Sequence, residues 1–352
     1  MNGMSQVKPI TIIGGGLAGL TLGIGLRQRG VPVTVWEAGR YPRHRVCGEF
    51  ISGNGPAIVE RLGLLARFEQ AGAFRAWTAL FVAGPNRSPV RRLPAPALCL
   101  SRHAMDALLA GAFQEFGGRL EQDRRWTSGE FGEGIVRASG RRPQPTESGW
   151  RWFGLKAHVC RSSPLDLAAD LEMHVSVGGY VGLNRINAGE VNVCGLFRAR
   201  RGDPQPGAIP ERLRGEAGTL LHERLAAARF EPDSVCSVAG LSLKPQRAAD
   251  RKDCCIGDAL TMTPPVTGNG MSMAFESAEI AIDPLADYSR GGLSWTEARR
   301  RITLRCDAAF SRRLAWARLL QWMMFSPALR SGFGSIALRS GWIWHLMFAK
   351  TR

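Results

Sequence analysis

The sequence predicts an α/β fold in which one discontinuous domain is interrupted by a β-rich domain and followed by a helical tail. Strand and helix patterns alternate over residues 7–36, and alternating apolar residues predict a sheet within residues 146–249. A glycine-rich strand–loop–helix pattern then returns near residue 258. We expect the first domain at residues 1–70, 98–145 and 250–290, the second at 71–97 and 146–249, and the helical C-terminal region at 291–352.

Local patterns predict the individual elements. Ser101 can cap a helix over residues 101–116, and the glycine pair at 117–118 ends it. The expected strands cover 7–13, 33–36, 74–82, 90–93 and 254–256, with a hairpin over 171–197 that turns near Asn187. The expected helices cover 16–29, 54–68, 209–227, a segment ending near 282, and most of 294–350 with a break at Pro327.

The first motif is ITIIGGGLAGL, in which Gly14, Gly16 and Gly19 have G-x-G-x-x-G spacing between a strand and a helix. Gly14 permits a tight turn, Gly16 lets a pyrophosphate approach the backbone, and Gly19 lets the helix pack closely on the strand. Leu17 and Ala18 complete the first turn, whose free N–H groups favour phosphate. The motif therefore predicts a dinucleotide site.

Glu37 ends the second predicted strand, about 20 residues beyond the glycines, and Ala38 follows it. A carboxylate in this position can accept hydrogen bonds from both hydroxyls of an adenosine ribose. This pattern does not distinguish FAD from NAD.

The second motif, CCIGDALTMTPPVTGNGMSMAFESA, distinguishes them. It resembles the G-D…P…G-x-G-x-x-x-A motif of the p-hydroxybenzoate hydroxylase and geranylgeranyl reductase superfamily of flavoproteins. The resemblance implies that Asp258 binds the ribityl chain of FAD and that the next helix points N–H groups at the flavin pyrimidine. The residues it places at the cofactor are Gly257, Asp258, Pro265, Gly268, Asn269, Gly270 and Met271.

Two further segments resemble the same superfamily. In YPRHRVCGEFIS the resemblance places Arg45, with Arg43 second, on a phosphate or ribityl group, and brings Cys47 and Gly48 near the flavin. In SRHAMDALLAGA it gives Arg102 a similar contact; a plain surface arginine is the alternative. Cys47 is either a buried structural cysteine or a proton donor.

The resemblance implies a Rossmann-like FAD-binding domain and an FAD-dependent oxidoreductase reduced transiently by NAD(P)H. The leading hypothesis is a monooxygenase of secondary metabolism that acts on a hydrophobic aromatic or polyketide-like molecule. The alternatives are a geranylgeranyl reductase-like alkene reductase and a non-catalytic flavin-binding protein. Ser139 stands where the hydroxylases carry an aspartate, and the halogenase W-x-W-x-I-P motif and a lysine within 70–100 are missing, which argues against halogenation.

The segment WFGLKAHV places Lys156 and His158 on one side of a predicted strand. One interpretation is a half-exposed strand with a polar face. The other is a substrate-facing pair in which His158 is an acid or base.

The chain carries a net charge of +16, and after Tyr288 there are twelve basic residues and two acidic ones. In this tail the arginines alternate with Leu, Trp, Met and Phe, which indicates a solvated helical face or peripheral contact with an anionic membrane. Nucleic acid is not expected because no nucleic-acid-binding motif accompanies the charge. The eight cysteines have no metal-ligand spacing, so we expect no metal and a reduced cytoplasmic location, with membrane contact at the inner face.

Overall fold

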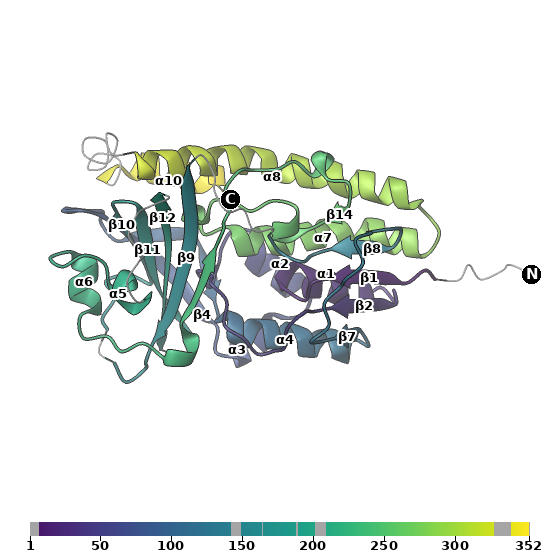
Figure 1. Ribbon diagram of the computed structural model, residues 1–352, viewed down its shortest axis with the longest axis horizontal. Coiled ribbons are helices and arrows are strands. Elements are labelled where there is room, and N and C mark those ends of the chain that lie inside the picture. Colours follow the sequence, from purple (N-terminus) through teal and green to yellow (C-terminus); the bar gives the residue numbers. More distant parts are fainter. Residues whose placement is uncertain are drawn as a thin grey trace, which may run out of the picture.

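The computed structural model describes residues 7–141, 149–163, 165–187, 189–200, 209–326 and 339–351. Two β-sheets lie side by side, and a long helix, α8 (Trp295–Phe325), runs along the outside of both (Figure 1). The described chain contributes strands to each sheet from segments that are far apart in the sequence.

The smaller sheet is parallel, with strand order β14-β8-β1-β2-β7. Its strands are β1 (Ile10–Ile13), β2 (Val33–Trp36), β7 (Arg119–Glu121), β8 (Ile135–Arg137) and β14 (Cys254–Cys255). Helix α1 (Leu17–Arg27) packs against α4 (Arg102–Glu115) and α7 (Gly270–Ser289). The residues of α1 from Leu17 to Leu26 are all buried, so this helix is the centre of the main hydrophobic core.

The larger sheet has strand order β13-β9-β12-β11-β10-β4-β6-β3, with β5 paired to β4. All its pairs are antiparallel except β10 with β4. The strands are β3 (Phe50–Ile51), β4 (Phe74–Ala83), β5 (Asn86–Arg87), β6 (Arg91–Cys99), β9 (Trp150–Val159), β10 (Leu171–Ser176), β11 (Gly179–Ile186), β12 (Glu190–Arg200) and β13 (Cys236–Ala239).

The remaining helices cover the sheets and join them. They are α2 (Gly55–Arg61), α3 (Leu65–Gln70), α5 (Ile209–Arg214), α6 (Leu220–Leu225), α10 (Gly341–Thr351) and the 3₁₀ turns Pro232–Ser234, Ala248–Asp250, Gly257–Ala259 and Pro265–Thr267. Helix α8 packs on α7 and also contacts α10. None of the helices in the described ranges is both long and apolar enough to cross a membrane.

Several sequence expectations are confirmed at the level of elements. The strand over 33–36 has the expected bounds, and the Ser101 side chain accepts a hydrogen bond from the backbone N–H of Ala104 at the start of α4. The segment 171–197 forms three strands rather than one hairpin, because the chain also turns at Gly178 (φ +80°). The expected break at Pro327 lies outside the described residues.

Two expected helices are shorter than the sequence pattern suggests. The helix expected over 209–227 is split into α5 and α6, because Gly215 and Gly218 between them have left-handed φ values of +76° and +78°. The helix expected over 54–68 is likewise split into α2 and α3 at Gly63, which has φ +70°. A glycine in the left-handed region ends a helix even where the apolar spacing continues.

Candidate functional site

The turn between β1 and α1 has the backbone geometry that a phosphate site needs. Gly14 has φ +113°, and a Cβ there would collide with the backbone carbonyl of Ala138. A Cβ on Gly19 would collide with the Gly14 carbonyl. A Cβ on Gly16 would meet no atom within 4 Å, and no side chain caps the helix that starts at Leu17, so its N–H groups face open space.

Glu37 lies at the end of β2, beside this helix start. One carboxylate oxygen accepts a hydrogen bond from Gly15 N at 2.9 Å, and the other accepts from Gly39 N at 2.9 Å and from Arg43 at 2.5 Å. Arg45 is also nearby, with a nitrogen 3.7 Å from Glu37. Ala38, the next residue, is exposed. Glu37 is therefore fixed against the glycine turn.

Two arginines connect this region to the start of α4. Arg102 forms a bidentate ion pair with the fully buried Asp106, with both N–O distances 2.8 Å. Arg45 also lies 3.2 Å from Asp106. Burial raises the pKa of Asp106, and Arg102 opposes this shift. Both arginines thus reach the same buried carboxylate, so Arg102 is not a plain surface arginine.

The second glycine-rich motif forms the mouth of α7. Gly268 is left-handed (φ +63°), and Gly270 starts the helix. The side-chain amide nitrogen of Asn269 donates to the carbonyl oxygen of Thr351 at 2.6 Å, and its Oδ1 is buried without a partner among the described residues. No side chain caps α7. The N–H groups of this 20-residue helix are therefore open to a ligand.

Asp258 lies in the 3₁₀ turn Gly257–Ala259 and lines the cavity described below. The residue is exposed on the cavity side but has protein around it, and this desolvation raises the pKa of its carboxyl group, with Arg141 opposing the shift. Burial in turn lowers the pKa of Arg141, which lines the same cavity. A carboxyl beside an arginine is a suitable partner for hydroxyl groups.

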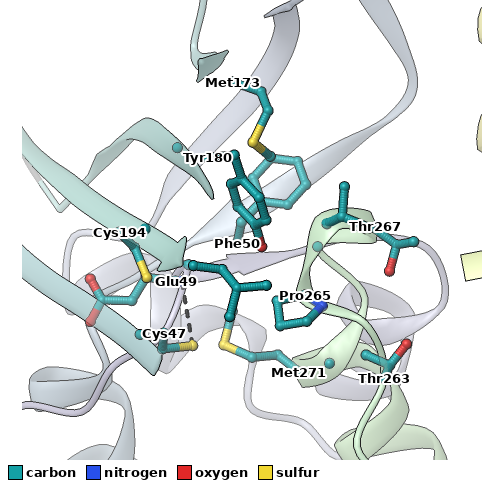
Figure 2. Close-up of a pocket in the computed structure, with 18 of the residues that line it drawn as sticks. Cys47, Glu49, Phe50, Met173, Tyr180, Cys194, Thr263, Pro265, Thr267 and Met271 are labelled. Carbon is teal, nitrogen blue, oxygen red and sulfur yellow. Dashed lines mark hydrogen bonds between the residues drawn. The ribbon is translucent and has the colours of Figure 1, made fainter. Parts of the chain in front are cut away.

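A cavity of about 260 Å³ lies between these motifs and the larger sheet. Figure 2 shows Cys47 and Cys194 on one side, Pro265 and Met271 on the other, and Tyr180 between them. The walls come from the segment 46–50, from β4 and β9–β13, from residues 258–271, and from the ends of α8 and α10. Burial raises the pKa of the Cys47 thiol, which remains protonated at neutral pH.

Behind the segment 46–50 lies a buried ionic cluster. Glu49, which is fully buried with φ +53°, pairs with Lys156 Nζ at 2.5 Å and with His158 Nε2 at 2.7 Å. The backbone N–H of Arg102 donates to the same carboxylate at 2.7 Å. Burial alone raises the pKa of Glu49, but the hydrogen bond from His158 and the charge of Lys156 outweigh it and lower the pKa overall. Glu49 is thus held as a carboxylate.

His44 extends this cluster toward the surface. Its Nδ1 is 3.5 Å from Lys156 Nζ, its ring centroid is 5.1 Å from that of His158, and it stacks on His103 at 4.6 Å. Desolvation, followed by the charge of Lys156, lowers the pKa of His44 to about 4. His44 is therefore neutral at neutral pH.

The structure corrects the interpretation of residues 152–159 as a half-exposed strand. Lys156 is fully buried and His158 is 4% exposed, because both point inward to Glu49. Among the residues that the structure describes, neither of these two side chains lines the cavity. The structure therefore does not place the pair where the substrate-facing interpretation expects it. Sequence analysis did not predict Glu49 as part of the site. A buried lysine needs a carboxylate partner, but this requirement does not say where in the sequence the partner lies.

The residues expected at the cofactor from the two glycine-rich motifs lie at two helix starts, and several residues of the second motif also line the cavity. Gly14 to Gly19 form one mouth, and Gly268 to Met271 form the other, with Gly48 and Pro265 on the wall. The open space at Gly16 and the unpartnered Asn269 Oδ1 fit a bound FAD.

Comparisons with known proteins agree with this geometry. Residues 7–148 match the FAD binding domain family. The flavin-dependent brominase Bmp2 has the same fold, with a TM-score of 0.75, 18% identity, and coverage of 98% of this chain and 93% of that one. PqsL, a probable FAD-dependent monooxygenase from Pseudomonas aeruginosa, has a TM-score of 0.70 and 17% identity, with coverage of 92% of this chain and 98% of that one. For p-nitrophenol 4-monooxygenase PnpA from Pseudomonas putida DLL-E4 the TM-score is 0.74 and the identity 15%, with coverage of 98% of both chains. No curated protein sequence matches.

The family match identifies residues 7–148 as an FAD-binding domain. The solved structures show that the whole chain shares its fold with flavin-dependent enzymes.

Proposed function

We propose that the protein is an FAD-dependent monooxygenase that oxidises a hydrophobic aromatic or polyketide-like small molecule with NAD(P)H and O₂. The observation that carries the proposal is the cavity between the second glycine-rich motif, the segment 46–50 and the larger sheet. Phe81, Met173 and Trp344 line it, so it suits an apolar ring system. Two proteins of the same fold bind or act on small aromatics by name: PqsL in complex with 2-aminobenzoylacetate, and p-nitrophenol 4-monooxygenase.

The cofactor would bind in an extended form along the residues that line its site. The glycine turn of residues 14–19 would hold the pyrophosphate, Glu37 the adenosine ribose, Asp258 the ribityl chain, and the α7 mouth the flavin pyrimidine. Bound FAD supplies hydride and oxygen chemistry, which no amino-acid side chain provides. The chain itself binds the reactants, orients them and keeps the site dry.

Tyr180 is our candidate for orienting the substrate. Its ring is buried on β11 and lies in the centre of the cavity in the view of Figure 2. Burial raises its pKa well above 10, so its hydroxyl stays a hydrogen-bond donor at all physiological pH values. In an apolar cavity such a donor would fix a substrate carbonyl or phenol oxygen.

The second candidate function is reduction of a polyprenyl or similar alkene, and the Cys47 thiol favours it. Cys47 lines the cavity and is held protonated by burial, so it can give a proton to a carbon centre next to the flavin. Cys194 lines the same cavity and its pKa is also raised by burial, which makes it a matched control.

Isotope labelling distinguishes the two functions. The protein, loaded with FAD, is incubated with NADPH or NADH and a panel of aromatic and prenyl compounds under ¹⁸O₂, and products are analysed by mass spectrometry. Monooxygenation puts one ¹⁸O into the product; alkene reduction adds two hydrogens without oxygen. If neither nicotinamide reduces the flavin, both functions are wrong. Bromide in the same assay tests halogenation.

Variants then test the assigned side chains. Tyr180→Phe should raise KM for an oxygenated substrate about tenfold or more, because one hydrogen bond to the substrate is lost. Cys47→Ala should leave monooxygenation within about twofold, whereas it should lower alkene reduction by about 100-fold or more, the range expected when a general acid is lost. Cys194→Ala should change neither reaction.

A further inference from the structure

The outward face of α8 combines positive charge with apolar side chains. We define the α8 outer face by its exposed residues, which share one side of the helix: Arg301, Leu304, Arg305, Arg312, Arg318, Leu319 and Trp322. At 1.5 Å per residue this 31-residue helix is about 46 Å long. It lies along the outside of both sheets (Figure 1). The face is therefore long, continuous and accessible.

Among the described residues, Arg301 is the one arginine of this face that pairs with an acidic side chain, Glu297, at 2.9 Å. Arg305, Arg312 and Arg318 form no ion pair among the described residues. The two acidic residues of α8 are engaged elsewhere. Glu297 pairs with arginines at the start of the helix, and Asp307 is turned inward, where it accepts hydrogen bonds from backbone N–H groups of the Ala248–Asp250 turn. The face thus presents unneutralised guanidinium groups.

The apolar residues on the same side are unusually exposed. Leu304 is 55% exposed, Leu319 42% and Trp322 63%, and on the neighbouring α10 Trp342 is 73% exposed. Arginine beside exposed Trp and Leu is the composition of helices that lie in the interface of a membrane. A helix that binds nucleic acid would need the charge but would gain nothing from the apolar residues.

We propose that the α8 outer face, together with Trp342, docks the protein on an anionic lipid bilayer with α8 parallel to the membrane plane. The arginines would meet lipid phosphates, and the indole and leucine side chains would enter the headgroup region. The inward sides of the same helices carry Leu320 and Met347, which line the cavity, so docking would bring the cavity wall to the lipid. The docking itself does not depend on which reaction the site performs.

Vesicle sedimentation tests the proposal. The FAD-loaded protein is mixed with vesicles of equal parts phosphatidylcholine and phosphatidylglycerol, or with phosphatidylcholine alone. We expect binding to the anionic vesicles that weakens as salt increases, and little binding to neutral ones. The triple variant Arg305→Gln/Arg312→Gln/Arg318→Gln should bind about 100-fold more weakly, because each arginine near an anionic surface contributes roughly fivefold.

A charge-matched control separates the face from net charge alone. Arg119→Gln/Arg124→Gln/Arg125→Gln removes three exposed arginines at and just after β7, on the other side of the molecule in Figure 1, and should bind within about threefold of the unmodified protein. Trp322→Ala/Trp342→Ala should weaken binding roughly tenfold without changing the salt dependence. All variants should keep their FAD, since none of these side chains lines the cavity within the described residues.

Three results would overturn the proposal. The first is a control triple variant that loses as much binding as the α8 triple variant, which would show a non-specific effect of net charge. The second is a tryptophan variant that binds as well as the unmodified protein, which would show that neither tryptophan enters the lipid. A duplex DNA or RNA that binds more tightly than the anionic vesicles, at the same salt, would assign the face to nucleic acid instead.

Discussion

The two glycine turns and the buried Glu49 cluster both lie at the site, but they are built in opposite ways. At Gly14 and Gly268 the backbone itself is the functional element, and the residue type is dictated by a positive φ. At Glu49, Lys156 and His158 the side chains make the interaction, and they meet across 107 and 109 residues of chain. Backbone sites therefore have a local sequence pattern, whereas side-chain clusters depend on the whole fold.

The largest expected effect concerns the glycine turn between β1 and α1, where the backbone itself makes the site. Gly14→Ala should prevent the protein from folding in soluble form, because its Cβ would collide with the Ala138 carbonyl at a left-handed φ. Gly16→Ala should fold normally, since Gly16 has φ −85° and open space around it, but should bind FAD at least about 100-fold more weakly. Thermal unfolding without cofactor and titration with FAD measure both effects. Normal FAD affinity in Gly16→Ala would contradict the phosphate assignment.

The next largest effect concerns the stability of the buried Glu49 cluster. Lys156→Met leaves Glu49 buried with one cation fewer and should lower the free energy of unfolding by about 3–5 kcal/mol. Lys156→Met combined with Glu49→Gln should recover part of this loss, because no unpaired charge remains. Urea unfolding measures the difference. Lys244→Met, which alters an exposed lysine, is the control and should change stability by less than about 0.5 kcal/mol.

The pH dependence of protein stability tests His44, which lies at the edge of the Glu49 cluster. The pKa of His44 is lowered to about 4, so between pH 4 and 6.5 the unfolded chain binds more protons at this residue than the folded one. Stability should therefore be complete above about pH 6.5 and fall as the pH drops toward 4. The ring is half-buried, so about 1–2 kcal/mol is expected.

His44→Gln should flatten this part of the stability curve, and His345→Gln, an exposed residue of α10, should not. The groups that act on His44 are Lys156, His158, His103 and Glu49. The pKa of Glu49 is lowered from 4.5, so its contribution is complete well above pH 4.5 and is lost at the lower end of this window and below it. A slope that survives in His44→Gln would assign the titration to another residue.

The smallest effect concerns a glycine that no function requires. Gly111 lies within α4, and a Cβ there would meet nothing within 4 Å. Gly111→Ala should raise the free energy of unfolding by about 0.5–1 kcal/mol, since alanine restricts the unfolded chain and favours helix. A thermal melt checks it. A loss of stability would show that the space around Gly111 is not available to a methyl group.

The comparison also explains what sequence analysis could predict. The parallel sheet and the glycine turn follow from local spacing, and the structure contains both. Local spacing also places Glu37 at the end of β2, where it bonds the backbone of the glycine turn; its contact with a ribose stays a prediction. The positions of Arg102 and Asp258 were expected from a resemblance rather than from their neighbours. In each case a short segment contains the whole signal.

Sequence analysis does not predict Glu49, although the residue lies inside YPRHRVCGEFIS, one of the segments that resemble the flavoprotein superfamily. The buried ion pairs of Glu49 depend on the register of β9, which turns Lys156 and His158 inward. They also depend on the start of α4, which brings the backbone N–H of Arg102 to the Glu49 carboxylate. Tyr180 and Arg141 were missed for the same reason: they become site residues only when the larger sheet closes on the smaller one. No spacing rule relates such distant positions.

The order in which the chain visits its two sheets has a consequence for folding kinetics. The strands of the smaller sheet come from residues 10–36, 119–137 and 254–255, and those of the larger sheet from the stretches between, so the chain crosses from one sheet to the other four times. A nascent polypeptide cannot complete the first sheet before β14 is synthesised. Such long-range pairing slows folding, and unfolding should be a single concerted event in which neither layer survives the other.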